Sequence, residues 1–169
     1  MIFPIVKFGD PVLETPAADI TTFDEELKKL AADMFESMYA ARGVGLAAPQ
    51  IGISKRIAVI DVTFKENPDA KLVLINPVII KKEGRQRSSE GCLSIPEFRE
   101  DVTRAKIVTI RAQDLTGKTF EHTGDELLAR AFLHETDHLN GKLYISHISG
   151  IKRDLIKRKI KKLVKAGEW

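Results

Sequence analysis

The segment His134-Glu135-Thr136-Asp137-His138 constrains this chain more than any other part of its sequence. In an α-helix, residues four apart lie on one face about 6 Å apart along the axis, so both imidazoles can reach a single metal ion. Glu135 is rotated from that face, yet it stays close enough to act as a general base toward a water molecule at the metal. The alternative interpretation is a charged helix with two incidental histidines.

A third metal ligand has to come from outside this helix. The extended pattern of one large metalloprotease group, which the chain follows as far as Gly141, would require a histidine at the position of Tyr144. Downstream candidates are few and poorly placed: His147, Asp154 and Glu168. Upstream, Cys92 lies between Gly91 and Pro96 in a segment that we expect to be a loop. A lone cysteine is usually a small buried hydrophobe, but a Cys-His-His set leaves a fourth position open for water, as catalytic sites do.

A third segment, Gly43–Gly52, contains no charged residue and is rich in glycine and alanine. Its small side chains would allow another stretch of backbone to approach closely. A helix end followed by a buried turn would explain the glycines, but it would not explain Gln50. The amide of this side chain could donate a hydrogen bond to a developing oxyanion.

The remaining pattern predicts three helices and several strands. Thr22 and Glu25 have the spacing of a capping box, which predicts a helix start there, and Gly43 is expected to end that helix. Five strand-like runs follow, the last two joined by a hairpin turn at 114–117: Ile57–Asp61, Leu72–Ile75, Val78–Lys82, Lys106–Gln113 and Lys118–Thr123.

Helical periodicity returns from about residue 125 to residue 140, and Ser149 is a plausible N-cap for a last helix that runs to Lys165. The apolar residues of that last helix are expected near one face: Ile151, Leu155, Ile160, Leu163 and Val164. This order predicts an α+β fold in which mixed or antiparallel sheets pack around a central metal-binding helix, with a C-terminal helix. The length of 169 residues suits a single catalytic domain over 1–169.

Charge is concentrated in the C-terminal part, 149–169. From Lys152 to Lys165 the chain carries eight Lys or Arg and one acid, although its net charge is only +3. A solvated face over a core stripe is the ordinary explanation of such a helix. The small net charge does not favour DNA binding, and no apolar run is long enough to cross a membrane. Without a recognisable secretion signal, and with a single cysteine, the chain is expected to be cytoplasmic.

Three segments, taken together, resemble the peptide deformylase family. Its motifs Gly-x-Gly-x-Ala-Ala-x-Gln, Glu-Gly-Cys-x-Ser and His-Glu-x-Asp-His-Leu-x-Gly stand here, in that order, at Gly43–Gln50, Glu90–Ser94 and His134–Gly141. The spacing and the terminal helix look like the bacterial type, so the resemblance covers essentially the whole chain. It implies hydrolytic removal of the formyl group from N-formylmethionyl nascent peptides, with release of formate. A zinc metallopeptidase that uses the same metal and water is the alternative, against which Tyr144 and Cys92 argue.

The resemblance also implies roles for individual residues. The family's metal ligands correspond to Cys92, His134 and His138, and its acid–base glutamate corresponds to Glu135. Its oxyanion donors correspond to the side-chain amide of Gln50 and the backbone N–H of Leu93. One divalent metal is implied, Fe(II) in the cell, with Zn, Ni or Co able to take its place. A thiolate with two imidazoles suits Fe(II) and Zn alike, so the sequence does not choose between them.

The methionine side chain and the small formyl group require a shaped, apolar site near the metal. Six residues are candidates for it: Val44, Gly45, Gly91, Arg99, Leu127 and Ala131. The two glycines would keep the site tight enough to exclude larger acyl groups. Leu127 and Ala131 precede His134 by seven and three residues and so share its face, with plain core packing as the alternative. Arg99 matches a family position that contacts substrate, with a solvated surface arginine as the alternative.

One residue departs from the family pattern. Leu133 stands where glutamine usually precedes the first metal histidine, which puts in doubt a hydrogen bond near the metal, for instance to Glu90. Asp137 is expected either to orient a metal histidine or to form a salt bridge on the helix. The resemblance further implies that the basic terminal helix docks on ribosomal RNA near the exit of the nascent chain, where contacts to phosphates would make binding depend steeply on salt.

Overall fold

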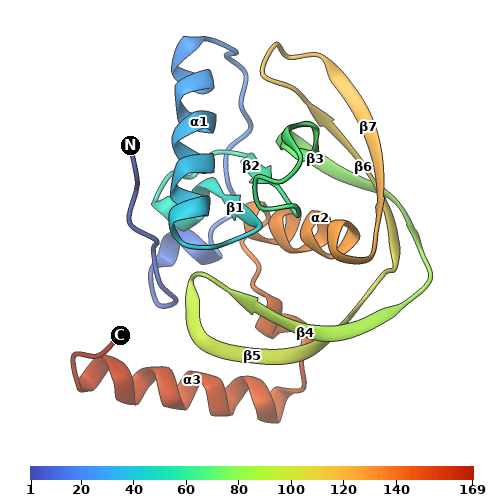
Figure 1. The fold of residues 1–169 in the computed structure, drawn as a ribbon. Helices are drawn as coiled ribbons and strands as arrows, with labels where there is room; N and C mark the ends of the chain where they lie inside the picture. The colour runs from blue at the N-terminus through green and yellow to red at the C-terminus, as the bar shows by residue number, and fades with distance from the viewer.

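The computed structural model describes residues 1–169, which form three α-helices, seven strands and four short 3-10 helices (Figure 1). The helices are α1 (Glu25–Ala40), α2 (Glu126–Leu139) and α3 (Gly150–Lys165). The strands are β1 (Gly45–Ala47), β2 (Ile57–Ile60), β3 (Leu72–Glu83), β4 (Gln86–Cys92), β5 (Ile95–Arg104), β6 (Ile107–Gln113) and β7 (Thr119–Asp125). No helix combines the length and the apolar character that crossing a membrane requires.

The strands form two antiparallel sheets with α2 between them. Five strands pair in the order β1-β2-β3-β6-β7, and β4 pairs with β5 in a separate hairpin. Helix α2 packs against all five strands of the large sheet. In Figure 1 it lies in the middle of the molecule, with the β4–β5 hairpin below it and α3 beyond the hairpin. The predicted α+β fold around a central helix is therefore confirmed.

The apolar side of α2 explains its central place. Its buried side chains Ala129, Phe132 and Leu133 share an apolar cluster with residues of β2, β3 and β6, among them Ile60 and Ile110. The opposite side of the helix, which carries the two histidines, faces the β4–β5 hairpin. Burying one side of α2 against the large sheet therefore fixes which way its histidines point.

The start and end of α1 differ from the prediction. The side chain of Asp24 accepts a hydrogen bond from the Leu27 N–H at 3.0 Å and caps the helix, so the predicted capping box beginning at Thr22 is wrong. An aspartate placed directly before the helix is at least as good a cap as threonine. The helix ends at Ala40, and Arg42, not Gly43, takes the left-handed conformation with φ of 59°.

The strand predictions were right for β2, β3, β6 and β7 of the large sheet, but they missed β1, which lies where a buried turn was expected, and both strands of the hairpin. The two runs predicted at 72–75 and 78–82 are one strand, β3, with an irregularity between Ile75 and Val78 where Asn76 has φ of 52°. The hairpin was missed, and Cys92 is the last residue of β4 and not part of a loop. Strand β4 reads Gln-Arg-Ser-Ser-Glu-Gly-Cys, so it lacks the alternating apolar residues that predict a strand.

The terminal helix begins as predicted but buries a different face. Ser149 caps it, accepting a hydrogen bond from the Lys152 N–H at 3.3 Å. Its buried residues are Ile156 and Ile160, which pack against the hairpin and Tyr144. Ile151, Leu155 and Val164 are 77%, 49% and 57% exposed. The predicted apolar face is therefore right for Ile160, which is buried, and for Leu163, which is half-buried, but wrong for the three exposed residues, because only a narrow part of this helix contacts the rest of the protein.

Candidate active site

Cys92, His134 and His138 meet between β4 and α2. The Nε2 atoms of the two histidines are 3.2 Å apart, and the Cys92 Sγ is 3.3 Å from the His138 Nε2. The three potential ligand atoms all lie within 4.8 Å of one another. A tetrahedral metal with bonds of about 2.0–2.3 Å would separate neighbouring ligands by roughly 3.3–3.6 Å. Two of the separations therefore match neighbouring corners around one metal ion, and all three atoms are close enough to share it.

Local structure explains why these atoms converge. The two histidines are four residues apart on α2, and their rings lie 4.8 Å apart between centroids. Cys92 reaches them from the end of β4, where the pairing with β5 shifts register between Gly91 and Cys92. A side chain at Gly91 would place its Cβ 2.8 Å from the guanidinium of Arg99. A larger residue beside the cysteine would therefore displace the Arg99 side chain.

The His134 ring is held from behind by a buried carboxylate. Its Nδ1 lies 2.7 Å from the Glu90 Oε2, which leaves Nε2 to face the other two ligand atoms. Such a contact fixes the tautomer and the orientation of a metal-binding histidine. Leu133 lies in the apolar cluster under the large sheet. The contact between His134 and Glu90 is therefore made without the glutamine that Leu133 replaces.

Asp137 does not contact either ligand histidine. Its carboxylate accepts a hydrogen bond from Arg104 at 2.8 Å and lies 2.9 Å from the His147 Nε2. Of the two predicted roles, the salt bridge is the one observed, although its partner is on β5. Tyr144, which stands where the metalloprotease pattern has a histidine, is 1% exposed and stacks on the His134 ring.

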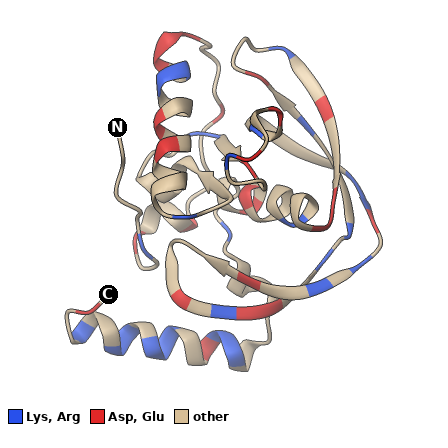
Figure 2. Ribbon diagram, in the orientation of Figure 1, with Lys and Arg blue, Asp and Glu red and all other residues tan.

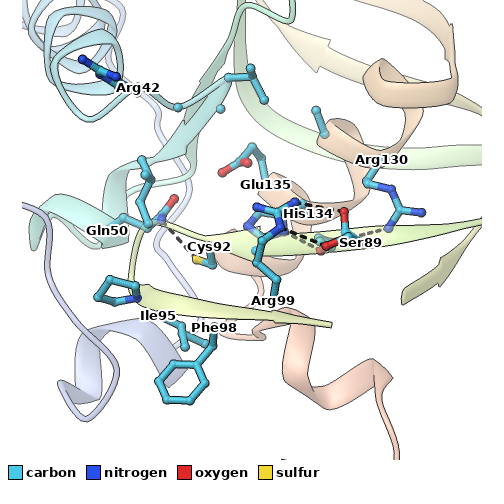
Figure 3. A pocket seen from close by; sticks show the side chains of 18 of the residues that line it. Arg42, Gln50, Ser89, Cys92, Ile95, Phe98, Arg99, Arg130, His134 and Glu135 are labelled. Carbon is cyan, nitrogen blue, oxygen red and sulfur yellow. Dashed lines mark hydrogen bonds and ion pairs between the residues drawn. The ribbon is translucent and has the colours of Figure 1, made fainter. Parts of the chain in front are cut away.

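Glu135 faces the cavity beside the cluster (Figure 3). It is 4% exposed, and its Oε1 has no hydrogen-bond partner. A Cβ at Gly45 would come within 2.5 Å of its Oε2, so this carboxylate has room only because that residue is glycine. Burial raises the pKa of Glu135. A buried, unpaired carboxylate with a raised pKa is what a general base working near neutral pH needs.

Burial raises the pKa of the Cys92 thiol, but the nearby imidazoles, His138 foremost, outweigh this effect and lower it to about 5. The thiol therefore ionises readily at neutral pH. A thiolate, and not a thiol, is the form that binds metals. This electrostatic effect supports the same interpretation as the distances.

Gln50 lies within reach of the cluster on the short helix Ala48–Ile51. Its Oε1 accepts a hydrogen bond from the Ala47 N–H at 3.0 Å, which turns its Nε2 toward Ser94 Oγ at 3.2 Å and Cys92 Sγ at 3.6 Å. Figure 3 shows the amide pointing at the sulfur. The Leu93 N–H, next to Cys92, donates to no acceptor within the protein. Two N–H groups are therefore close to the place where the three ligand atoms meet.

A cavity of about 580 Å³ opens onto this cluster. All six residues predicted to shape the substrate site line it: Val44, Gly45, Gly91, Arg99, Leu127 and Ala131. Leu127 is 48% exposed, so it is not a core residue, whereas Ala131 is 5% exposed and belongs both to the core and to the cavity wall. Arg99 borders the cavity but is also exposed, and it donates to Ser89 Oγ at 2.9 Å; its contact with substrate stays a prediction.

The sequence did not point to Arg104 and Arg130, which both bind Glu90. Arg104 donates to Glu90 at 3.1 and 2.7 Å, and Arg130 donates at 2.6 Å. These residues are 14 and 40 positions away from Glu90, beyond the reach of any local pattern. One signal was available for Arg130, because it interrupts the apolar run Leu-Leu-Ala-Arg-Ala-Phe-Leu on the buried helix. A buried arginine requires a partner.

Comparison with known proteins gives a consistent result. Residues 2–154 match the model of the family described as polypeptide deformylase. A peptide deformylase of Acidobacterium capsulatum is 64% identical over 169 residues, covering 100% of this chain and 99% of that protein. One from Bartonella quintana is 48% identical, covering 97% of this chain and 94% of that protein.

Solved structures show the same similarity in three dimensions. The crystal structure of a peptide deformylase from Legionella pneumophila is 44% identical and superposes with a TM-score of 0.91, covering 99% of this chain and 98% of that one. The structure of the peptide deformylase from Thermotoga maritima is 43% identical, with a TM-score of 0.82, and covers 88% of this chain and 99% of that one.

Proposed function

Because this chain belongs to the peptide deformylase family and removes the N-formyl group from the N-terminal methionine of nascent polypeptides, we propose that the cavity beside Cys92, His134 and His138 is where this hydrolysis takes place. The reaction adds water across the formyl C–N bond, which breaks to give formate and a free amine. The observation that carries the proposal is the convergence of one thiol and two imidazoles within 4.8 Å at the wall of a cavity. The family assignment sets aside the metallopeptidase alternative.

The residues present fit a single divalent metal. The ligand atoms of Cys92, His134 and His138 are close enough to share one ion, Glu90 orients one imidazole, and Glu135 leaves a buried oxygen unpaired nearby. We propose Fe(II) as the metal in the cell, with Zn, Ni or Co able to bind the same atoms. When bound, such an ion supplies a Lewis acid that polarises the formyl carbonyl and acidifies a water molecule.

Glu135 is the group that moves the proton in this proposal. Its unpaired Oε1 can accept a proton from the attacking water as the new C–O bond forms. The same carboxylic acid then gives that proton to the nitrogen as the C–N bond breaks, so the amine leaves neutral. The close approach of Gly45 holds the carboxylate in place during both transfers.

Gln50 and the Leu93 N–H are proposed to stabilise negative charge on the formyl oxygen. Both groups lie next to Cys92 and present N–H donors there. A Gln50→Leu variant keeps the approximate volume of the side chain but removes the donor. We expect kcat to fall by about 10²–10³, as it does when one oxyanion donor is lost elsewhere.

Metal analysis is the control for the Gln50→Leu variant, because the Gln50 amide also contacts Cys92 Sγ. A variant that carries a full complement of metal and still turns over a formyl-Met-Ala peptide at the normal rate would remove Gln50 from the mechanism. Formate release is the quantity to measure, because cleavage of a peptide bond would not produce formate.

The cavity walls account for a preference for formyl-methionine. Val44, Leu127 and Ala131 supply apolar surface for the methionine side chain. The side chains of Glu135 and Arg99 lie against Gly45 and Gly91 and fill the space there, so a bulkier acyl group would meet those side chains. Arg99, held by Ser89, borders the cavity and is placed to contact the peptide beyond the methionine.

The basic face of α3 is proposed to dock on ribosomal RNA, which places the enzyme in the cytoplasm beside the chains that it processes. Figure 2 shows lysine and arginine along the whole of this helix. Ile156 and Ile160 bury its inner side, so the cations at 157, 158 and 161 are exposed. Removing the helix would take away those two isoleucines and uncover the apolar side chains that they cover, among them Ile95 and Val102 of the hairpin, so charge reversal is the cleaner test.

The triple variant K157E/R158E/K161E should bind ribosomes at least about tenfold more weakly. Its binding should also depend less on salt: the slope of log affinity against log salt should decrease in magnitude by roughly 0.7–0.9 for each phosphate that the helix no longer neutralises. Hydrolysis of a free formyl-Met-Ala peptide should be unchanged. The matched control K28E/K81E/K118E makes the same change of net charge at exposed positions outside α3. Equal weakening by the two triple variants would show that only net charge matters and that α3 is not the docking surface.

A further inference from the structure

Glu90 is held in one orientation by four polar contacts to its carboxylate. The residue is 4% exposed. Its Oε1 accepts from Arg104 Nε at 3.1 Å and from Arg130 Nη1 at 2.6 Å. Its Oε2 accepts from Arg104 Nη2 at 2.7 Å and lies 2.7 Å from His134 Nδ1. A carboxylate offers about four acceptor positions, and all of them are used here.

Arg130 is one of only two arginines that bind Glu90. Arg104 is shared, since its Nη1 also donates to Asp137 at 2.8 Å. The buried group therefore contains two carboxylates, Glu90 and Asp137, and two guanidinium groups, Arg104 and Arg130. Removing Arg130 would take away one of the two guanidinium groups and leave the buried Glu90 Oε1 with Arg104 Nε as its single donor. Glu90 would then be free to turn away from its present orientation.

Arg130 also joins the two structural elements that carry the ligand atoms. It lies on α2, four residues before His134 and on the same face. Its Nη2 donates to the backbone carbonyl of Val102 on β5 at 3.0 Å, while its Nη1 binds Glu90 on β4. One side chain therefore holds the helix of the two histidines against the hairpin of Cys92.

Arg130 borders the cavity but is not placed to bind substrate charge. Its side chain is 7% exposed, and both terminal nitrogens are engaged by Glu90 and Val102. Figure 3 shows its guanidinium turned toward the strand below it and away from Glu135. Its contribution must therefore act through its partners.

We propose that Arg130 is a positioning residue for the metal centre: by fixing Glu90 it holds the His134 imidazole in the orientation that binds the metal. This inference rests on the proposed role of His134 as a ligand. It predicts an effect on metal affinity and on the spectrum of the bound metal that loss of a merely structural arginine would not produce.

The test measures the cobalt affinity of the enzyme by competition with a chelator, together with the visible absorption spectrum of the cobalt-loaded protein. R130M and R130Q should bind cobalt about 10–100-fold more weakly than wild type, the range found when neighbours of metal ligands are removed. Their cobalt spectra should change as well. R130K keeps a charge and one donor to Glu90, and should recover part of the lost affinity.

Two comparisons decide how Arg130 acts. In an E90Q background, R130M should cause little further loss of affinity, because both changes break the same link and are not additive. R87M is the matched control, since Arg87 lies on the same hairpin but is exposed and pairs with Asp101. It should bind cobalt as wild type does.

Folded R130Q or R130M protein with wild-type cobalt affinity and spectrum would overturn the inference, as would full additivity with E90Q. R130Q decides the question alone if R130M does not fold. An H134A variant separates this inference from the proposed function. Wild-type cobalt affinity in H134A would mean that the proposed metal site is wrong. Loss of affinity in H134A with normal affinity in R130Q would mean that only the role of Arg130 is wrong.

Discussion

Replacing Glu135 with alanine is expected to lower kcat by about 10²–10⁴, the usual contribution of a positioned general acid or base, while the metal stays bound. The reason is the position of its carboxylate, which is buried at the cavity wall with one oxygen unpaired. None of the three proposed ligand atoms belongs to Glu135, so metal content should match wild type. Formate release from formyl-Met-Ala and metal analysis of the same sample are the two measurements.

The pH dependence of the reaction rate offers a second test of the role of Glu135. A proton acceptor works only when it is deprotonated, and burial raises the pKa of Glu135 above that of an ordinary glutamate. The rate of the wild-type enzyme should therefore fall as pH decreases, starting at a higher pH than an unperturbed carboxylate would give. The residual activity of a Glu135→Gln variant should lack this fall.

The matched control for Glu135 is Glu121→Ala. Glu121 lies on β7, is exposed and pairs with Arg111, far from the cavity wall. The Glu121→Ala variant should release formate from formyl-Met-Ala at the wild-type rate. If Glu135→Ala kept wild-type turnover with its metal in place, the proton would have to move through another group, and the proposed mechanism would be wrong.

The second large effect is expected from Cys92→Ala. This change removes one of the three proposed ligands, so metal affinity should fall by more than the roughly 10–100-fold that loss of a neighbouring hydrogen-bonding group costs. The rate of formate release should fall in step with the metal content of the protein. The thiol is suited to this role because the imidazoles of His138 and His134 lower its pKa to about 5, so that a thiolate is available at neutral pH.

Cys92 is the only cysteine in the chain, so its reactivity reports on the site without interference. A thiol-alkylating reagent should modify wild-type enzyme slowly when metal is bound and quickly after a chelator removes the metal. Ser94→Ala serves as the matched control, because Ser94 is buried close to Cys92 and accepts a hydrogen bond from Gln50. It should keep its metal. Equal alkylation rates with and without metal would show that the sulfur is not a ligand.

The chemistry of the site could be predicted from sequence because much of it is local. The spacing of His134 and His138 places them on one helix face whatever surrounds that helix. Cys92 and Gln50 stood out as candidates in their own segments, and the order of three short motifs supported their roles through the family resemblance. All six residues expected around the substrate line one cavity.

Residues that act through distant partners could not be predicted in this way. Arg104 and Arg130 bind Glu90 across 14 and 40 positions, and such pairs leave no periodic pattern. Strand β4 was missed because its side chains are polar and only Glu90 among them is fully buried. The buried face of α3 was misjudged because exposure of Ile151 and Leu155 depends on where the helix lies against the hairpin.

The most direct test of the proposed metal centre is X-ray absorption at the metal edge of the zinc-loaded enzyme. If Cys92, His134 and His138 surround one ion, the spectrum should require one sulfur at about 2.3 Å and nitrogen or oxygen neighbours at about 2.0–2.1 Å. The sulfur contribution should disappear in Cys92→Ala. A wild-type spectrum that fits nitrogen and oxygen alone would contradict the proposed centre.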